Sequence, residues 1–204
     1  MTHSLGTHDV ALLQSFLTDI GQGKPTHVPV YDKSLHQGRG DRAPPSEWLS
    51  IPNPRDYQII IVEGWCVGFE AIDEARLLSA YKSTSRTLSH HTLEHLRAMN
   101  DYLRDYTKIL NFDAFVHIDA EDLKWVYEWR QEQEDALRRD KGDETAGMSK
   151  EEVIRFVDGY YPAYELYTED LRKGLFRDSA QGSRSRHLRL IVGRDRKVKE
   201  AKRL

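Results

Sequence analysis

The chain has 204 residues, of which 31% are charged and 39% are hydrophobic, and its formal net charge at pH 7 is −3. This length fits one domain with a core of useful size, and the near balance of charge excludes a globally basic nucleic-acid-binding protein. No apolar run approaches the roughly 18 residues of a membrane-spanning helix, and a single cysteine, Cys66, excludes an internal disulfide.

The two ends of the chain add little to this picture. The N-terminus, "MTHSLGTHD", is neither a signal peptide nor a basic transit segment, so we expect a cytosolic protein. Residues 194–204 are strongly basic, and we interpret them as a solvated tail rather than a nucleic-acid-binding arm.

The first predicted helix covers residues 9–20. It places Val10, Leu13, Phe16, Leu17 and Ile20 on one face, and Gly21 and Gly23 follow as stop signals. Residues 26–31, "THVPVY", predict a short extended piece.

The segment 57–65, "YQIIIVEGW", is a continuous apolar run that ends at Glu63 and Gly64. Such a run is typical of a strand buried on both faces, as in a parallel sheet. The sequence "DAFVHID" at 113–119 predicts a second buried strand that again ends in an acid, and "HLRLIVG" at 187–193 predicts a last one.

Helices are expected between and after these strands. Two are predicted over residues 88–110 and 121–141. A third starts at a capping box formed by Ser149 and Glu152 and runs to about Gly159, and a fourth runs from Pro162 to about Arg172. Strands that alternate with helices predict an α/β fold with a largely parallel sheet, here as a single domain over 1–204. Such sheets bind ligands beyond the carboxyl ends of their strands.

Glu63 is the first candidate site residue. A carboxylate at the tip of a buried strand needs a cation, a metal ion or hydrogen bonds to offset its desolvation. In nucleotide-handling proteins an acid at this place holds Mg²⁺ or its water, whereas a structural ion pair or a helix cap is the plain alternative.

The loop 31–42 is the second candidate. Gly38 and Gly40 allow backbone shapes closed to other residues, while Lys33, Arg39 and Arg42 offer donors suited to carboxylate or phosphate. Asp9, before the first helix, is by itself a helix N-cap, and His8 beside it is weak evidence alone.

The charged helix 121–141 carries Arg130, Arg138 and Arg139. These arginines can close over phosphates like a lid, or they can pair with Glu132, Glu134 and Asp135 on the same helix. His90, His91 and His95 include an i,i+4 pair, but no third ligand is in an obvious place, so we interpret them as a solvated face.

Five stretches together resemble one family. They are "GTHDVALL", "VPVYDKSLHQGRGDR", "IIIVEGWCVGF", "LNFDAFVHIDAEDLKWVYEWRQEQE" and "GMSKEEVIRFVDGYYPAYELY", and they span roughly residues 5–193. The chain resembles the D-glycerate 3-kinase-like group, including the fungal ATP-dependent kinases, which are P-loop kinases similar to uridine kinase and phosphoribulokinase.

The resemblance implies a parallel-sheet, three-layer P-loop kinase domain. It implies that the protein uses ATP and Mg²⁺ to phosphorylate a hydroxyl of a glycerate-like or other small-molecule acceptor. Neither a nucleic acid nor a membrane is expected as a partner. It implies that Glu63 acts on Mg²⁺ or the nucleophile and that residues 121–148 form a lid in which Arg130 and Arg138 face the nucleotide phosphates. It implies that "GTHD" and "YDKS…GDR" bind the acceptor, with these residues: His8, Asp9 (also catalytic), Tyr31, Asp32, Lys33, Asp41 and Arg42.

The chain departs from the family at one motif. A G-x-x-x-x-G-K-[ST] phosphate-binding loop occurs nowhere in residues 1–204, and in the family that loop lies upstream of "GTHD". We therefore expect an N-terminally incomplete kinase domain, with a catalytically inactive binding module as the alternative.

Overall fold

The structure is a computed structural model that describes residues 8–38, 40–176 and 186–204. The sequence predicts one domain, whereas the contacts within the chain divide it into two compact units. Unit 1 comprises residues 1–67 and 101–111, and unit 2 comprises 68–100 and 112–204. The long helix α4, Leu93–Ile109, contributes to both.

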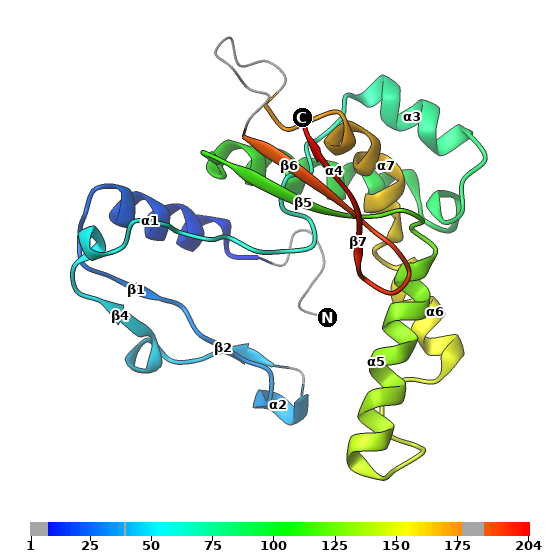
Figure 1. Ribbon diagram of the computed structural model, residues 1–204, viewed down its shortest axis with the longest axis horizontal. Helices are drawn as coiled ribbons and strands as arrows, with labels where there is room; N and C mark the ends of the chain where they lie inside the picture. Colours follow the sequence, from blue (N-terminus) through cyan, green and yellow to red (C-terminus); the bar gives the residue numbers. More distant parts are fainter. Residues whose placement is uncertain (1–7, 39, 177–185) are drawn as a thin grey trace. The chain divides into compact units, whose positions relative to one another are not determined.

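Unit 1 consists of one long helix and two small antiparallel ladders (Figure 1). Strands β1 and β4 form one ladder, and β2 and β3 form the other. Its elements, besides the end of α4, are α1 Val10–Gly21, β1 Thr26–Val28, β2 Tyr31–Asp32, α2 Leu35–Gly38, β3 Asp41–Arg42, β4 Leu49–Ile51 and the 3₁₀ turns η1 Pro45–Glu47 and η2 Pro54–Asp56. The predicted helix at 9–20 and the extended piece at 26–31 are confirmed.

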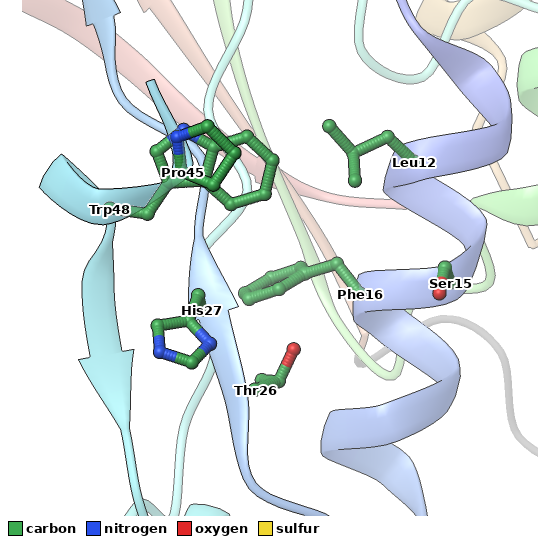
Figure 2. A pocket seen from close by; sticks show the side chains of 7 residues that line it. All are labelled: Leu12, Ser15, Phe16, Thr26, His27, Pro45 and Trp48. Carbon is green, nitrogen blue, oxygen red and sulfur yellow. The ribbon is translucent and has the colours of Figure 1, made fainter. Parts of the chain in front are cut away.

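The apolar face of α1 lines a shallow pocket rather than a closed core. Leu12 and Phe16 point from α1 toward His27 and Trp48, as Figure 2 shows, and the space between them is about 280 Å³. The indole Nε1 of Trp48 donates to the carbonyl of Ala43 at 2.8 Å, which fixes the far wall. Consistent with an open pocket, no residue of α1 is fully buried.

The predicted buried strand at 57–63 is wrong. This segment forms no strand, and Ile59 and Ile61 are 77% and 85% exposed. A continuous apolar run becomes a buried strand only when other strands pair with its edges and other elements cover its faces. No segment among the described residues pairs with this one, so hydrophobicity alone did not determine its structure.

Unit 2 is built on a three-stranded sheet with the order β5-β6-β7. Strand β5 is parallel to β6, and β6 is antiparallel to β7. Its elements are β5 Phe115–Ala120, β6 His187–Val192, β7 Val198–Arg203, α3 Glu74–Lys82, α5 Trp125–Lys141, α6 Lys150–Asp158, α7 Tyr161–Arg172, the 3₁₀ turn η3 Leu88–His90 and the start of α4. The predicted α/β class, the two strands predicted in this unit and the helices predicted over 88–110, 121–141, 149–159 and 162–172 are confirmed, whereas helix α3 was not predicted. Strand β5 is buried on one face only, because Val116 and Ile118 are 57% and 70% exposed.

The basic C-terminal segment differs from its prediction. Residues 198–203 are exposed, as expected of a solvated tail, but they form strand β7 on the edge of the sheet. Alternating charges and small residues allow an exposed edge strand, and the neighbouring β6 supplies the hydrogen-bonding partner that composition does not reveal.

Asn100 ties the start of unit 2 to its helices. Its side-chain oxygen accepts from the backbone N–H of Ile72 at 2.9 Å and from the hydroxyl of Tyr167 at 3.1 Å, and its amide nitrogen donates to the carbonyl of Ile72 at 2.8 Å. Because a buried amide is costly when unpaired, these bonds define one arrangement of α4, α7 and the segment before α3. No helix among the described residues has the length and apolar content needed to cross a bilayer.

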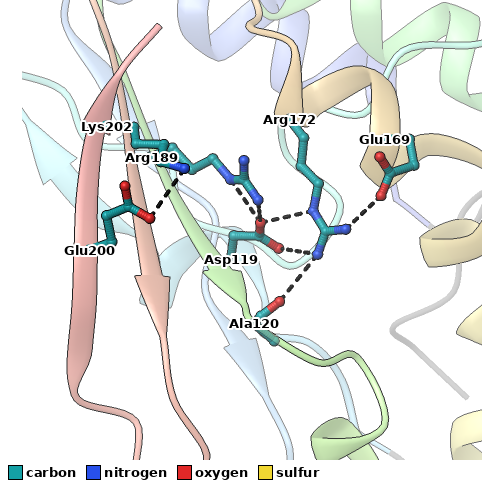
Figure 3. A network of polar contacts seen from close by, with 7 residues as sticks. All are labelled: Asp119, Ala120, Glu169, Arg172, Arg189, Glu200 and Lys202. Atoms are coloured by element: carbon teal, nitrogen blue, oxygen red, sulfur yellow. Dashed lines mark hydrogen bonds and ion pairs between the residues drawn. The ribbon is translucent and has the colours of Figure 1, made fainter.

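Asp119, near the carboxyl end of β5, holds α7 against the sheet (Figure 3). Its carboxylate is 1% exposed and accepts from Arg172 of α7 at 2.9 and 3.0 Å and from Arg189 of β6 at 2.8 and 2.5 Å. Burial alone would raise the pKa of Asp119, but the two guanidinium groups outweigh it and hold the pKa below its usual value.

We predict that Asp119→Asn lowers the free energy of unfolding by about 3–5 kcal/mol, since Arg172 and Arg189 lose the buried negative charge that they share, although Arg172 keeps its pair with the exposed Glu169. Urea denaturation measures the change. Asp105→Asn removes an exposed pair with Lys108 and serves as the control, with no measurable loss expected. A loss at Asp119 as small as at Asp105 would contradict this account of the network.

A second prediction concerns pH. Burial lowers the pKa of His117, on β5 beside Asp119, to about 4, so the folded chain binds fewer protons than the unfolded chain. Stability should therefore be full above pH ~6.5 and fall as the pH drops toward 4, by up to about 3 kcal/mol from this group. Replacing His117 with Asn should flatten the dependence of the urea midpoint on pH, whereas replacing the exposed His95 should not. If the urea midpoint of His117→Asn depends on pH as steeply as that of the wild type, the predicted contribution of His117 is wrong.

Candidate functional site

Two of the polar side chains that the sequence singled out in unit 1, Asp9 and Arg42, meet at the N-terminus of α1. Asp9 is the N-cap of this helix: its Oδ1 accepts from the backbone N–H of Leu12 at 3.0 Å. Its Oδ2 accepts from Nη2 of Arg42, on β3, at 2.9 Å. The predicted N-cap and the loop 31–42 are therefore parts of one cluster.

This pairing keeps Asp9 ionised. The backbone hydrogen bond from Leu12 and then the contact with Arg42 hold the pKa of the carboxyl below its usual range. Both side chains remain about 40% exposed, so a ligand from solution can reach them. An exposed carboxylate beside a guanidinium can accept a hydrogen bond from a hydroxyl while the cation contacts an anion.

The β2–β3 hairpin presents four of the predicted residues in two facing pairs. Tyr31 lies opposite Arg42, and Asp32 lies opposite Asp41. Gly40 enters β3 with φ +73°, and a Cβ there would lie 2.5 Å from the Tyr31 hydroxyl. Both its conformation and this close approach require glycine.

The two hairpin aspartates are held by neighbours within the loop. Asp41 accepts from the backbone N–H of Arg42 at 2.7 Å and contacts Nε2 of His36 at 3.0 Å, and these bonds lower its pKa. Asp32 accepts from the hydroxyl and N–H of Ser34 at 2.6 and 2.7 Å, which lowers its pKa too. Both carboxylates therefore shape the loop and stay negatively charged.

His8, next to Asp9 in the chain, contacts a residue far away in the sequence. Its Nδ1 lies 2.8 Å from the hydroxyl of Tyr106, on α4, and the two rings meet edge to face. Tyr106 and His36 were missed by sequence reasoning. His36, five residues before Asp41, could have been found from loop proximity, whereas Tyr106 had no local signal.

Lys33 and Glu63 are not brought into the cluster, and Arg39, the other donor predicted in the loop, lies outside the described residues. The side chains of Lys33 and Glu63 are exposed, and within the described part of the chain no hydrogen bond or ion pair links either of them to Asp9 or Arg42. Glu63 follows an irregular segment instead of a buried strand, so the burial that first marked it as a candidate is absent. Its metal and catalytic roles remain predictions.

Arg130 and Arg138 belong to unit 2, where both are engaged along the α5–α6 hairpin. Arg130 contacts Glu134 and donates to Gln133 at 2.5 Å, and Arg138 donates to Asp135 at 2.9 Å and to the carbonyl of Met148. Of the alternatives that the sequence left open, pairing on the same helix is the one present here.

The α5–α6 hairpin is closed at its far end. The buried Glu134 accepts from the backbone N–H of Met148 at 2.8 Å, and Gly147, with φ +77°, leaves room for this carboxylate. Ser149 and Glu152 form the predicted capping box at the start of α6. The proposed lid segment is therefore a folded helical hairpin.

The residues that the structure describes hold no group of three or more His, Cys, Asp and Glu side chains placed to bind a metal ion. Of the three histidines predicted to form a solvated face, His90 and His95 are exposed, whereas His91 is half-buried and its Nε2 contacts the carbonyl of Asp158 at 3.1 Å. A phosphate-binding loop is missing from the 204 residues as well.

Comparison with known proteins identifies relatives of one kind. The chain is 39% identical over 165 residues to "Uncharacterized kinase mug58" of Schizosaccharomyces pombe, which covers 79% of this chain and 57% of that protein. It is 34% identical over 170 residues to the chloroplastic D-glycerate 3-kinase of Arabidopsis thaliana, covering 81% of this chain and 34% of the relative. No protein-family model matches the chain.

A solved structure shares the fold. The D-glycerate 3-kinase of Cryptococcus neoformans superposes with a TM-score of 0.82 at 29% identity, over 98% of this chain and 68% of that one. The resemblance and the fold class inferred from the sequence are confirmed by these findings. The chain spans between a third and somewhat over half of the curated relatives that it matches.

The geometry of Asp9 gives a prediction for the site. Asp9→Ala removes the N-cap, so the amide of Leu12 should exchange with solvent several-fold faster. Asp9→Asn keeps a capping oxygen and loses only the charge opposite Arg42, so Leu12 should stay near the wild-type rate. Amide exchange followed by NMR distinguishes the two. Equal acceleration in both variants would show that the cap depends on the Arg42 contact.

Proposed function

Because the chain belongs to the family of kinases similar to D-glycerate 3-kinase, we propose that it supplies the acceptor-binding part of an ATP-dependent kinase. The acceptor is a small anionic hydroxy compound such as D-glycerate, and the reaction places a phosphoryl group on one of its hydroxyls. The relatives are named as kinases, and one of those matched in sequence is named for D-glycerate, which supports both the reaction and the acceptor class.

One observation supports this proposal above the others. The ion pair between Asp9 and Arg42 joins the "GTHD" and "GDR" motifs, which the resemblance assigned to the acceptor independently of each other. A purely structural role for each motif would not require them to meet. Their meeting places a cation and a carboxylate where one small ligand can contact both.

The residues of the cluster have complementary roles in this proposal. Arg42 neutralises the carboxylate of the acceptor. Asp9 accepts a hydrogen bond from its hydroxyl and so orients the oxygen that will attack. Because phosphoryl transfer needs mainly positioning and charge neutralisation, these tasks suffice for the acceptor side.

In this proposal other residues that the resemblance assigned to the acceptor surround the Asp9–Arg42 pair. Tyr31 and His8 offer a hydroxyl and an imidazole beside the charged pair. Asp32 and Asp41 hold the loop in shape through Ser34 and His36.

The nucleotide side does not fit the described residues. ATP and Mg²⁺ would need backbone amides in a glycine-rich loop, a lysine and a hydroxyl ligand, and residues 1–204 contain no such motif. Glu63 as a magnesium ligand and Arg130 and Arg138 as phosphate ligands therefore remain proposals from the resemblance alone. The predicted cytosolic location also stays a prediction, and one relative is named as chloroplastic.

The lack of a phosphate-binding motif in residues 1–204 suggests a second candidate function. A module that binds the acceptor without turnover would keep the Asp9–Arg42 cluster and need no phosphate-binding loop. The absence of that motif from the 204 residues favours this alternative for the chain taken by itself.

A thermal-shift experiment tests the proposal. D-glycerate at about 100 times its dissociation constant should raise the melting temperature by several degrees, since binding to the folded state adds ~2.7 kcal/mol. Arg42→Ala should abolish the shift, and the control Lys82→Ala, on α3, should retain it. If neither D-glycerate nor another small hydroxy acid shifts the wild type, the proposed acceptor site is wrong.

Mg²⁺·ATP added to the same samples separates the two functions. A further rise that Glu63→Gln removes supports the kinase. No effect of Mg²⁺·ATP alongside a D-glycerate shift supports the non-catalytic module.

A further inference from the structure

The turn between β6 and β7 contacts helix α5 in unit 2. The indole Nε1 of Trp129, in the first turns of α5, donates to the backbone carbonyl of Arg194 at 2.7 Å. An indole N–H is a donor only, and here its acceptor is fixed backbone rather than a mobile side chain. The helix is thus attached directly to the residues that follow the carboxyl end of β6.

Two arginines of the same turn reinforce this contact. Arg194 pairs with Glu128, and Nη2 of Arg196 lies 2.7 Å from a carboxylate oxygen of Glu132. The guanidinium of Arg196 also lies over the Trp129 ring, 5.4 Å from its centroid, within the range of a cation–π contact. Positions 128, 129 and 132 share one face of the helix, so the turn binds a continuous surface.

The turn itself has a defined shape. The N–H of Gly193 donates to the carbonyl of Lys197 at 3.0 Å, and the N–H of Arg196 donates to the carbonyl of Gly193 at 2.9 Å. Arg196 has φ +58°, an uncommon conformation for a residue with a side chain. This backbone directs its guanidinium to α5, and the cost of that conformation needs a compensating contact.

The opposite face of α5 packs on α6. Tyr127 donates its hydroxyl to Asp158 at 2.6 Å, and the Arg130 guanidinium lies 5.2 Å from the centroid of Phe156. Held from both sides, α5 cannot rotate about its axis without breaking contacts at residue 129 or at residue 130. The direction in which Arg130 points is therefore coupled to the contacts of Trp129.

We propose that the β6–β7 turn is an anchor for helix α5, and that Trp129 and Arg196 are positioning residues for Arg130. That Arg130 binds nucleotide phosphates rests on the proposed function, because only a kinase would supply that ligand. The anchor itself does not depend on the proposed function. It predicts that losing contacts on one face of α5 changes the environment of a side chain on the other face.

The pieces of the anchor should respond differently to salt. Arg194, Arg196 and their glutamate partners are all 40–65% exposed, so high ionic strength weakens those pairs. The indole-to-carbonyl bond is not an ion pair and should persist. Trp129 is consequently the central residue of the anchor, and the arginines adjust its strength.

Hydrogen exchange and NMR on the full chain test this proposal. Trp129→Phe removes the N–H and keeps an aromatic ring, Arg196→Ala removes the guanidinium, and Arg196→Lys keeps the charge. Lys202→Ala is the matched control, because it removes a cation of the same hairpin whose partner is Glu200 on β7 rather than a residue of α5.

We expect α5 amides in Trp129→Phe to exchange about fivefold faster, the factor that one net hydrogen bond corresponds to, with α7 unchanged. Arg196→Ala should give a smaller effect that 0.5 M NaCl reproduces in the wild type, and Arg196→Lys should partly restore protection. The ¹⁵Nε resonance of Arg130, a buried atom with no hydrogen-bond partner among the described residues, should shift in Trp129→Phe and stay in place in Lys202→Ala.

Unchanged α5 exchange, or a uniform rise across unit 2, would overturn the anchor. An unmoved Arg130 resonance together with faster α5 exchange would overturn the positioning role. Failure to bind Mg²⁺·ATP would count against the proposed function and leave both of these results valid.

Discussion

The carboxylate of Asp9 is the constraint on which the candidate site depends. One of its oxygens begins helix α1, and the other binds Arg42 of the hairpin that carries the remaining polar residues. Because a single side chain makes both contacts, the N-terminus of the helix and the β2–β3 hairpin cannot move apart without losing a cap or an ion pair. This coupling holds the start of α1 and the hairpin together, as the proposed acceptor site requires.

Unit 2 depends on a different principle. Its sheet, helix α7 and the segment before α3 are joined by buried polar groups with complete sets of partners, Asp119 and Asn100. Such groups contribute less to net stability than to the choice of one arrangement, since any other arrangement leaves a buried charge or amide unpaired. A scaffold specified in this way can carry the α5–α6 hairpin in a defined orientation.

Much of the fold could be predicted from the sequence where the signal is local. The capping box at Ser149, the N-cap at Asp9 and the apolar strand at 113–119 each contain their own evidence. The strand expected at 57–63 failed, because a strand depends on partners that a hydrophobic run does not specify. Strand β7 was missed for the converse reason, since its partner β6 compensates for a polar composition.

In the candidate site, too, local motifs could be predicted from the sequence, whereas contacts between distant residues could not. The motifs around Asp9 and Arg42 singled out two residues that the structure brings together, but their ion pair spans 33 positions and needed the structure. Tyr106 was invisible for the same reason, at a separation of 98 positions from His8. Arg130 and Arg138 could be foreseen as either phosphate ligands or helix pairs, and only the structure shows the pairs that they make.

The central claim is that Asp9 and Arg42 form one acceptor site, and a crystal structure of the chain with D-glycerate tests it most directly. The account predicts that the ligand carboxylate lies within hydrogen-bond distance of the Arg42 guanidinium, with a hydroxyl donating to Asp9. A ligand bound elsewhere, or a hairpin that leaves Arg42 paired only with Asp9 at saturating D-glycerate, would contradict it.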